Sequence, residues 1–189
     1  NKNMFTYKDI NLIELPDKRL RQKSNDLKLP LNNEDVELIE KMIFHVNNSQ
    51  EKNTKFRPAV GVAAVQYGIL KNVFYILIKD EKENIIFSDA LVNPKVLGHS
   101  NNFLCIKEGE GCLSVNESWK NQEGYIPRYN RIILEAYSYF DKKVKKYDLS
   151  GYPAIVAQHE FDHLNGKLFI DHINLKNPWN LPDNAEILE

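Results

Sequence analysis

The sequence has little of what marks secreted, membrane-spanning or nucleic-acid-binding proteins. It holds only 2 cysteines in 189 residues, too few for the disulfide framework of a small secreted protein. No apolar run approaches the roughly 20 residues that a membrane-spanning helix needs. The 25 Lys and Arg residues nearly balance 26 Asp and Glu residues, so the net charge of -1 favours neither nucleic acid nor a membrane as the partner. We therefore expect a reducing compartment and a small or neutral partner.

The composition favours one globular domain over the whole chain, residues 1–189. Hydrophobic residues make up 42% of the chain and charged residues 27%, which suits a single sizeable core, and no repeat or linker divides the sequence. Within this domain we expect an extended N-terminal segment at 1–30 and a proline-interrupted tail at 175–189. The chain begins with Asn1 rather than Met, so a removed upstream targeting segment is one interpretation of its start.

Hydrophobic spacing predicts an α+β fold, with mainly antiparallel strands and a helix towards each end. An amphipathic helix is expected within 32–50, where an Asn cap and an acidic first turn precede an apolar stripe. The stripe consists of Val36, Ile39, Ile43 and Val46. The expected strands are 60–68, 72–80, 85–99 and 101–109, with breaks at Asp89 and Asn93-Pro94, and then a hairpin of 131–140 and 144–149.

A second helix is predicted from about Ser150-Gly151 to Asn165-Gly166, and it contains the sequence HEFDH. His159 and His163 are four residues apart and share a helix face, so both imidazoles can reach one metal ion. Glu160 lies about 100° round the helix, beside such a metal rather than bound to it. The pattern H-E-x-x-H is typical of sites where a glutamate takes a proton from a metal-bound water.

Solvated positions on a surface helix are the alternative for these two histidines. Their helical spacing argues against it, because they continue an apolar stripe that starts with Tyr152, Ile155 and Val156 and should point inward. Two buried imidazoles without partners would be costly, whereas a shared metal satisfies both.

Two imidazoles need at least one further ligand. Phe169 stands where a third histidine would follow, and the remaining glutamates, Glu186 and Glu189, lie beyond two prolines. Cys112 is the strongest candidate, because a thiolate binds zinc or iron well and glycines on its N-terminal side let the backbone bend towards a metal. Cys105 lies in a strand-like run and is expected in the core.

Three separated stretches together resemble the signature motifs of peptide deformylases: GVAAVQ (61–66), EGCLS (110–114) and QHEFDH (158–163). Their order and spacing also match, over about 60–171. The resemblance implies an enzyme that removes the formyl group from the N-terminal formyl-methionine of nascent chains. It also implies one Fe(II) ion held by Cys112, His159 and His163, although a Cys-His-His set suits Zn(II) or another divalent metal equally well.

The resemblance further implies roles for individual residues. Glu160 acts as general base and then as general acid, while the side-chain amide of Gln66 and the backbone N–H of Leu113 donate to the oxyanion. Glu110 matches a family position that pairs with an arginine, here Arg128. The residues expected to bind substrate are Val60, Gly61, Glu110, Gly111, Tyr152, Ile155 and Val156.

Each role has a plainer alternative. Gln66 can be an ordinary polar residue at a strand end, Ile155 and Val156 can be core residues, and an ion pair between Glu110 and Arg128 can lie on the surface, worth under about 1 kcal/mol. The chain also departs from the family pattern, with Ala59 where the first motif usually opens with glycine, a longer segment at 116–125, and a prolyl chain end that gives no support to ribosome contact through a C-terminal helix.

Two other functions stay open on this reasoning. A metallopeptidase can use the same helix motif but not a cysteine ligand, and a structural metal site needs a fourth protein ligand, for which Cys105 is the candidate. If the resemblance holds, the partners are N-formylmethionyl nascent peptides, with no nucleic acid or membrane. Asn and Lys are abundant in the sequence, and this Asn and Lys bias then favours an organelle of bacterial descent, a plastid, apicoplast or mitochondrion, with the bacterial cytoplasm as the alternative.

Overall fold

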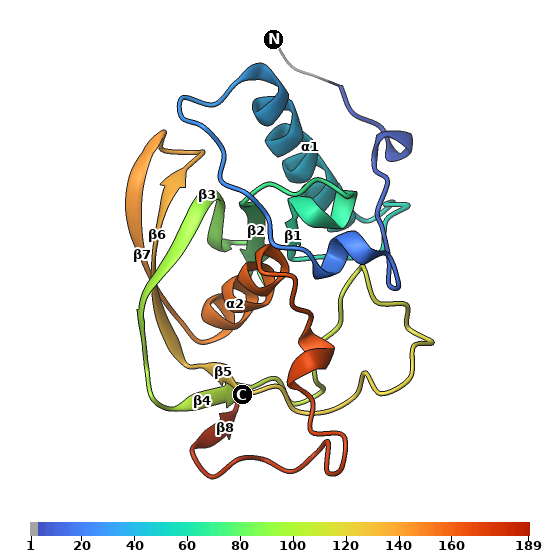
Figure 1. The fold of residues 1–189 in the computed structure, drawn as a ribbon, viewed down its shortest axis with the longest axis vertical. Helices are drawn as coiled ribbons and strands as arrows, with labels where there is room; N and C mark the ends of the chain where they lie inside the picture. Colours follow the sequence, from blue (N-terminus) through green and yellow to red (C-terminus); the bar gives the residue numbers. More distant parts are fainter. Residues whose placement is uncertain (1–3) are drawn as a thin grey trace.

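The computed structural model describes residues 4–189 and has an α+β fold with two sheets (Figure 1). The larger sheet has the strand order β1-β2-β3-β6-β7, and every neighbouring pair is antiparallel. Its strands are β1 (Gly61–Ala63), β2 (Val73–Lys79), β3 (Ile85–His99), β6 (Arg131–Ser138) and β7 (Lys143–Ser150). The expectation of mainly antiparallel sheets is confirmed.

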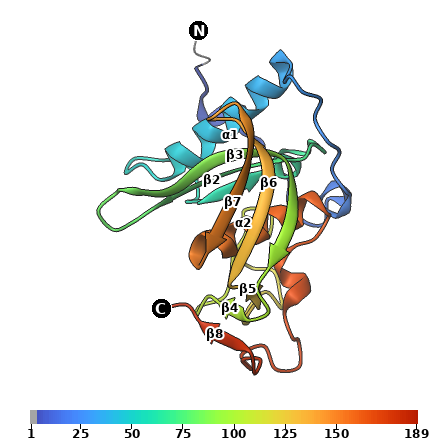
Figure 2. The ribbon, with the colours of Figure 1, turned by 90° about the vertical axis from the view of Figure 1, so that its left-hand side faces the viewer.

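A second, three-stranded sheet lies at the end of the molecule opposite helix α1 (Figure 2). It consists of β5 (Arg128–Tyr129), β4 (Phe103–Cys105) and β8 (Ala185–Ile187). Strand β8 pairs with β4 in parallel, so the proline-interrupted tail adds an edge strand to this sheet. The two α-helices are α1 (Asn33–Ser49) and α2 (Tyr152–Leu164). Among residues 4–189, no helix is both long and apolar enough to cross a membrane.

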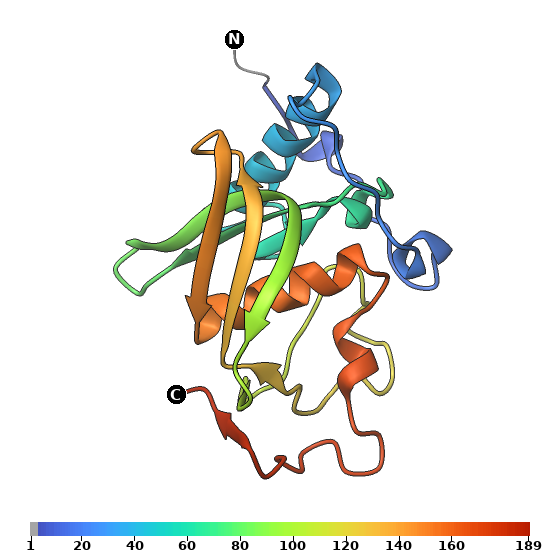
Figure 3. The same ribbon diagram turned by 60° about the vertical axis from the view of Figure 1, so that its left-hand side comes forward.

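The two α-helices cover opposite faces of the larger sheet (Figure 3). Successive side chains of a strand point to opposite faces, and β2 shows both sets. Phe74, Ile76 and Ile78 join the core with α2, while Val73, Tyr75 and Leu77 join the core with α1. Because both faces are covered, β2 is a continuous apolar run rather than an alternating one.

Helix α1 begins where the sequence predicts, but its buried face is partly different. The Asn32 side chain caps it by accepting the N–H of Asp35 at 2.8 Å. Ile39 and Val46 are buried as expected, whereas Val36 and Ile43 are only partly buried. Leu38 and Met42 take their places against the sheet.

The region 60–68 is less extended than predicted. Only Gly61–Ala63 is a strand, and Ala64–Tyr67 forms the short 3-10 helix η3. The Gln66 side-chain oxygen accepts the N–H of Ala63 at 3.0 Å, which closes this turn. Gly68 then ends it with a φ of 81°, a conformation that glycine adopts without strain. The turn matters because it carries Gln66 into the interior.

The predicted breaks in 85–99 are wrong, since β3 runs unbroken for 15 residues. Asp89 is buried within the sheet, where its carboxylate accepts the hydroxyl groups of Ser138 at 2.5 Å and Tyr147 at 2.7 Å. Asn93 has a positive φ of 54° beside a register shift, so the strand bulges there and continues. Strand β3 therefore accommodates Asp89 through its partners on β6 and β7, and it accommodates Asn93 through the bulge.

The N-terminal segment has little regular structure over the described residues 4–30. Two short 3-10 helices, η1 (Tyr7–Asp9) and η2 (Lys18–Arg21), interrupt it, and Leu20 is fully buried. Between them the N–H of Ile13 donates to Gln66 O at 2.8 Å, and the N–H of Leu15 donates to Ser114 O at 2.9 Å. The segment therefore joins two of the motif-bearing stretches.

Ile76→Ala should lower the free energy of unfolding by about 2–5 kcal/mol, because it opens a cavity between β2 and α2. Ile76 is fully buried, whereas Ile85, in the same sheet, has 63% of its surface exposed. Ile85→Ala is thus the matched control and should change stability by less than about 0.5 kcal/mol. Urea unfolding of both variants measures this, and equal losses would contradict the assigned core.

Candidate active site

Helix α2 and the loop after β4 bring together three side chains of the types that bind metals. The ligand atoms of Cys112, His159 and His163 all lie within 4.8 Å of one another, and His163 Nε2 is 3.3 Å from Cys112 Sγ. Among residues 4–189, these three residues form the one group of His, Cys, Asp or Glu side chains that could hold a metal ion. Cys105 is not part of that group. A thiolate with two imidazoles is a donor set that suits Fe(II) or Zn(II), so the residues fit the metal that the resemblance implies.

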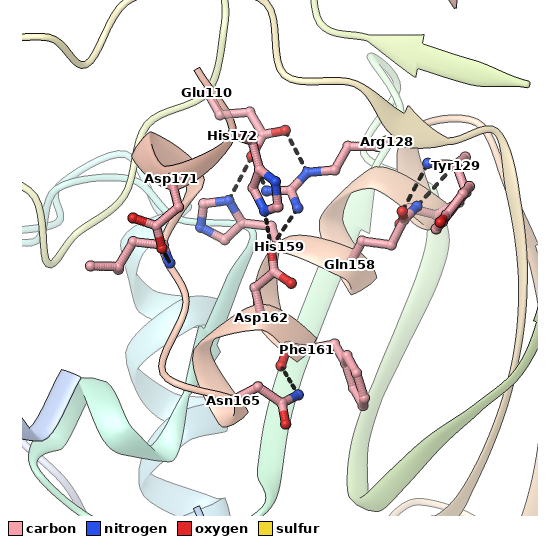
Figure 4. Close-up of polar contacts among 12 residues, drawn as sticks. Glu110, Arg128, Tyr129, Gln158, His159, Phe161, Asp162, Asn165, Asp171 and His172 are labelled. Atoms are coloured by element: carbon pink, nitrogen blue, oxygen red, sulfur yellow. Dashed lines mark hydrogen bonds and ion pairs between the residues drawn. The ribbon is translucent and has the colours of Figure 1, made fainter. Parts of the chain in front are cut away.

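The His159 ring is held in a fixed orientation. Its Nδ1 donates to Glu110 Oε1 at 2.8 Å, since a carboxylate can only accept (Figure 4). This bond leaves Nε2 of His159 free to face Cys112. A carboxylate that orients a metal-binding histidine in this way is a common feature of metal sites.

The electrostatics of the cluster favour the thiolate. Burial alone would raise the pKa of the Cys112 thiol, but the neighbouring His163 and His159 outweigh burial and lower that pKa to about 5. Burial likewise opposes ionisation of Glu110, yet Arg128 and His159 hold the pKa of its carboxyl at about 2. Cys105 has no such neighbours, and burial raises its pKa to about 11. Of the two cysteines, Cys112 is therefore the one whose lowered pKa favours the thiolate, the form that binds a metal.

The cluster opens into a cavity of about 420 Å³. Most of the residues predicted for the site line it: Val60, Gly61, Gln66, Glu110, Gly111, Cys112, Leu113, Tyr152, Ile155, Val156, His159 and Glu160. The two exceptions, His163 and Arg128, are buried and do not line this cavity. Three stretches that are far apart in the sequence therefore form one concave site.

Glu160 lies beside the cluster. It is buried, and within the described residues 4–189 its Oε1 has no hydrogen-bond partner. Burial raises the pKa of this carboxyl, although His159 and His163 act against that effect. Gly61 makes room for it, because a Cβ at that position would lie 2.8 Å from Glu160 Oε2. A buried carboxylate in a cavity, unpaired and next to metal ligands, is suited to proton transfer.

Gln66 is oriented towards the same place. Its side-chain oxygen is occupied by the N–H of Ala63, so the amide Nε2 points to Cys112 Sγ at 3.5 Å and Ser114 Oγ at 3.2 Å. The residue is buried, and it belongs to η3 rather than to a strand end. Its donor is therefore held next to the metal-binding group.

The pairing of Glu110 with Arg128 is present, but the surface alternative for it is wrong. Both side chains are only 4% exposed, and the contacts are bidentate, at 2.9 Å from Arg128 Nε and 2.8 Å from Arg128 Nη2. Arg128 Nη1 also donates to Asp162 Oδ2 at 2.7 Å (Figure 4). Asp162 lies in the motif QHEFDH on α2, but its partner Arg128 lies on β5, so the sequence alone assigns no role to Asp162.

Other residues of the site were missed from the sequence. Gln50, Arg57, Pro58 and Ile106 line the cavity, and Arg57 Nη1 contacts Cys112 O at 3.3 Å. Gln158, the first residue of QHEFDH, exchanges two hydrogen bonds with the backbone of Tyr129, each of 2.8 Å (Figure 4). These bonds fix α2 to β5. Gln158 lies in a quoted motif but had no assigned role, and no local pattern marks the other four residues, because the groups that they meet in the site are distant in the chain.

Comparison with known proteins decides the family. The family model for polypeptide deformylase matches residues 10–179, which include all three motif stretches. This chain belongs to the polypeptide deformylase family. A peptide deformylase from Mycoplasmopsis pulmonis (strain UAB CTIP) is 49% identical over an alignment of 190 positions, which covers 93% of this chain and 96% of that protein.

Solved deformylase structures share the fold. A probable peptide deformylase from Synechococcus phage S-SSM7 is 32% identical, with a TM-score of 0.71 over 87% of this chain and 99% of that one. The class I type b peptide deformylase from Acinetobacter baumannii, solved with Met-Ala-Ser bound, is 25% identical, with a TM-score of 0.69 over 87% of this chain and 98% of that one.

The departure from the deformylase motif at Ala59 causes no backbone strain, because Ala59 has no positive φ. Its N–H donates to Ser49 Oγ at 3.1 Å, and its carbonyl accepts from Gln50 Nε2 at 2.9 Å. The end of α1 therefore holds this part of the cavity wall, and glycine is not required there.

Metal-free protein should contain one thiol that iodoacetamide alkylates at about pH 6. The lowered pKa of Cys112 means that its thiolate is present above about pH 5 and is lost as the pH falls through that value. Cys105 should stay unmodified, because it is fully buried and its pKa is raised. Alkylation rates against pH, read by mass spectrometry, measure this, with Cys105→Ser as the control. A midpoint at the ordinary thiol value of 9.0 would contradict the account.

Proposed function

We propose that this chain is a metal-dependent peptide deformylase, a hydrolase that removes the N-formyl group from the N-terminal formyl-methionine of newly made polypeptides. The observation that carries the proposal is the three-donor group Cys112, His159 and His163 beside the unpartnered Glu160 in one cavity. Membership of the polypeptide deformylase family supports it. All of these parts lie in one domain, residues 1–189.

Cys112, His159 and His163 would hold one divalent metal ion, Fe(II) in the native enzyme, with Zn(II) or another divalent ion able to replace it. When bound, the ion supplies Lewis-acid activation of a water molecule and of the formyl oxygen. The lowered pKa of Cys112 supports this ligand set, since the thiolate is the binding form. With three protein ligands the site keeps an open position, as catalytic sites do.

Glu160 is the general base and then the general acid. It removes a proton from the attacking water, whose oxygen bonds to the formyl carbon. When the C–N bond breaks, Glu160 returns that proton to the departing amine, and formate leaves. Its free Oε1 and the burial that favours its protonated form support both steps.

Gln66 Nε2 and the backbone N–H of Leu113 stabilise the negative oxygen that forms at the formyl carbon. Gln66 is preorganised for this, because its own oxygen is occupied by Ala63 N–H and its donor already points to the cluster. Preorganised donors are effective since they need not reorient during the reaction.

The methionine side chain fits the apolar wall of Tyr152, Ile155 and Val156, of which Ile155 and Val156 lie about one helical turn before His159. Beside it, Val60, Gly61 and Gly111 offer backbone against which the peptide can lie as an added strand. The Met-Ala-Ser peptide bound by the Acinetobacter baumannii deformylase supports a methionyl peptide as the ligand of this cavity.

The relatives favour a bacterial setting. The sources of the Mycoplasmopsis and Acinetobacter deformylases are bacteria, which supports the bacterial cytoplasm over the organelle that the Asn and Lys bias favours. That bias reflects base composition as readily as location.

Glu160→Gln should keep the metal and lower kcat by about 10²–10⁴, because the three ligands remain while the base is lost. The assay is release of formate from formyl-Met-Ala-Ser by protein prepared without oxygen, with metal content measured in parallel. Glu81→Gln, in the exposed turn between β2 and β3, is the control and should retain full turnover.

Wild-type turnover by Glu160→Gln with intact metal would contradict the role of Glu160. Cleavage of an internal peptide bond, with no release of formate, would favour the metallopeptidase. A bound metal with no turnover of either substrate would favour the structural site.

A further inference from the structure

The polar network around the metal ligands extends beyond the family motifs to His172. This histidine belongs to the 3-10 helix η4 (Phe169–His172), which follows α2. Its Nε2 lies 2.8 Å from Asp162 Oδ2, the same oxygen that accepts Arg128 Nη1 at 2.7 Å (Figure 4). A continuous chain of contacts thus runs from His172 through Asp162, Arg128 and Glu110 to His159.

The charges in this chain of contacts explain why His172 is needed beside Arg128, Glu110 and Asp162. One guanidinium, that of Arg128, faces two carboxylates, and it uses Nε and Nη2 on Glu110, which leaves Nη1 for Asp162. Glu110 and Arg128 are 4% exposed and Asp162 is 17% exposed, so solvent contributes little to them. The ring N–H of His172 is therefore the second donor to Asp162.

The orientation of each group depends on the next one. With its Oδ2 held by two donors, Asp162 fixes the outer nitrogen of Arg128, and Arg128 in turn fixes both oxygens of Glu110. Glu110 Oε1 then sets the ring of His159, whose Nε2 faces the metal site. Bidentate contacts transmit such an orientation because they leave little rotational freedom.

We propose that His172 is a positioning residue that acts through Asp162, Arg128 and Glu110 to hold His159 ready for the metal. This inference rests on the proposed metal site. It assigns a function to η4, which lies outside the three sequence motifs and does not line the active-site cavity.

His172 can be substituted without disturbing the core. Its side chain is 35% exposed, and together with Asp162 and Arg128 it borders a second cavity of about 350 Å³. Gln158, Phe161 and Asp162 of α2 line this second cavity. They lie on a different face of the helix from the α2 residues that line the active-site cavity. A replacement side chain therefore has space, and the variants should fold.

The test compares His172→Phe, which keeps a ring without a donor, with His172→Gln, whose amide N–H reaches about as far as Nε2. The readout is the affinity of each chelator-stripped protein for Co(II), measured by competition with a chelator of known affinity. His172→Phe should bind Co(II) about tenfold more weakly, in the lower range for outer groups of a metal site, and His172→Gln should stay within about twofold of wild type. His99→Phe, on an exposed histidine outside the network, is the control and should match wild type.

Equal Co(II) affinity of His172→Phe and wild type would overturn the proposal. Equal weakening in His172→Phe and His172→Gln would also overturn it, because the ring rather than the donor would then matter. If the His172 variants have the same thermal unfolding midpoint as wild type, any loss of Co(II) affinity is a local effect and does not reflect a less stable fold.

The proposed function is tested separately, by measuring the release of formate. Wild type that binds Co(II) normally but releases no formate would contradict the deformylase and leave the role of His172 intact. If wild type bound no metal, crystal structures of the metal-free proteins would decide. A contact between Glu110 and His159 that stays at 2.8 Å in His172→Phe would overturn the proposal, and a broken contact restored in His172→Gln would support it.

Discussion

The buried ion pair between Glu110 and Arg128 connects the parts of the chain on which the candidate site depends. Arg128 comes from β5, Glu110 from the loop that carries Cys112, and the pair contacts α2 at both His159 and Asp162. Removing one partner of such a pair leaves a buried charge and commonly destabilises a protein by about 3–5 kcal/mol. The loop, the small sheet and the helix are therefore fixed relative to one another by charge as well as by packing.

The opposite side of the site is fixed by backbone hydrogen bonds. Ile13 and Leu15 of the N-terminal segment bond to the carbonyls of Gln66 and Ser114, so one extended piece of chain holds both motif loops in register. Gln66 and Ser114 also contact each other through their side chains. The N-terminal segment thus helps to hold the amide donor of Gln66 at 3.5 Å from the sulfur of Cys112.

What could be predicted from the sequence follows from local periodicity and motif spacing. Helix α2, strand β2 and the β6–β7 hairpin each show their own apolar pattern, and the predicted site residues come together because their motifs lie on or beside these elements. Their catalytic roles stay predictions. The unbroken strand β3 could not be foreseen, since the groups that satisfy Asp89 lie 49 and 58 residues further along the chain. The same holds for Gln158 with Tyr129 and for His172 with Asp162, whose pairing depends on the fold.

The most direct test of the account is X-ray absorption spectroscopy of the zinc-loaded protein. The account predicts that the chain supplies one sulfur and two imidazole nitrogens, from Cys112, His159 and His163, with the remaining position open to solvent. Two sulfur ligands would show that Cys105 completes a closed structural site, and that result would contradict the catalytic centre described above.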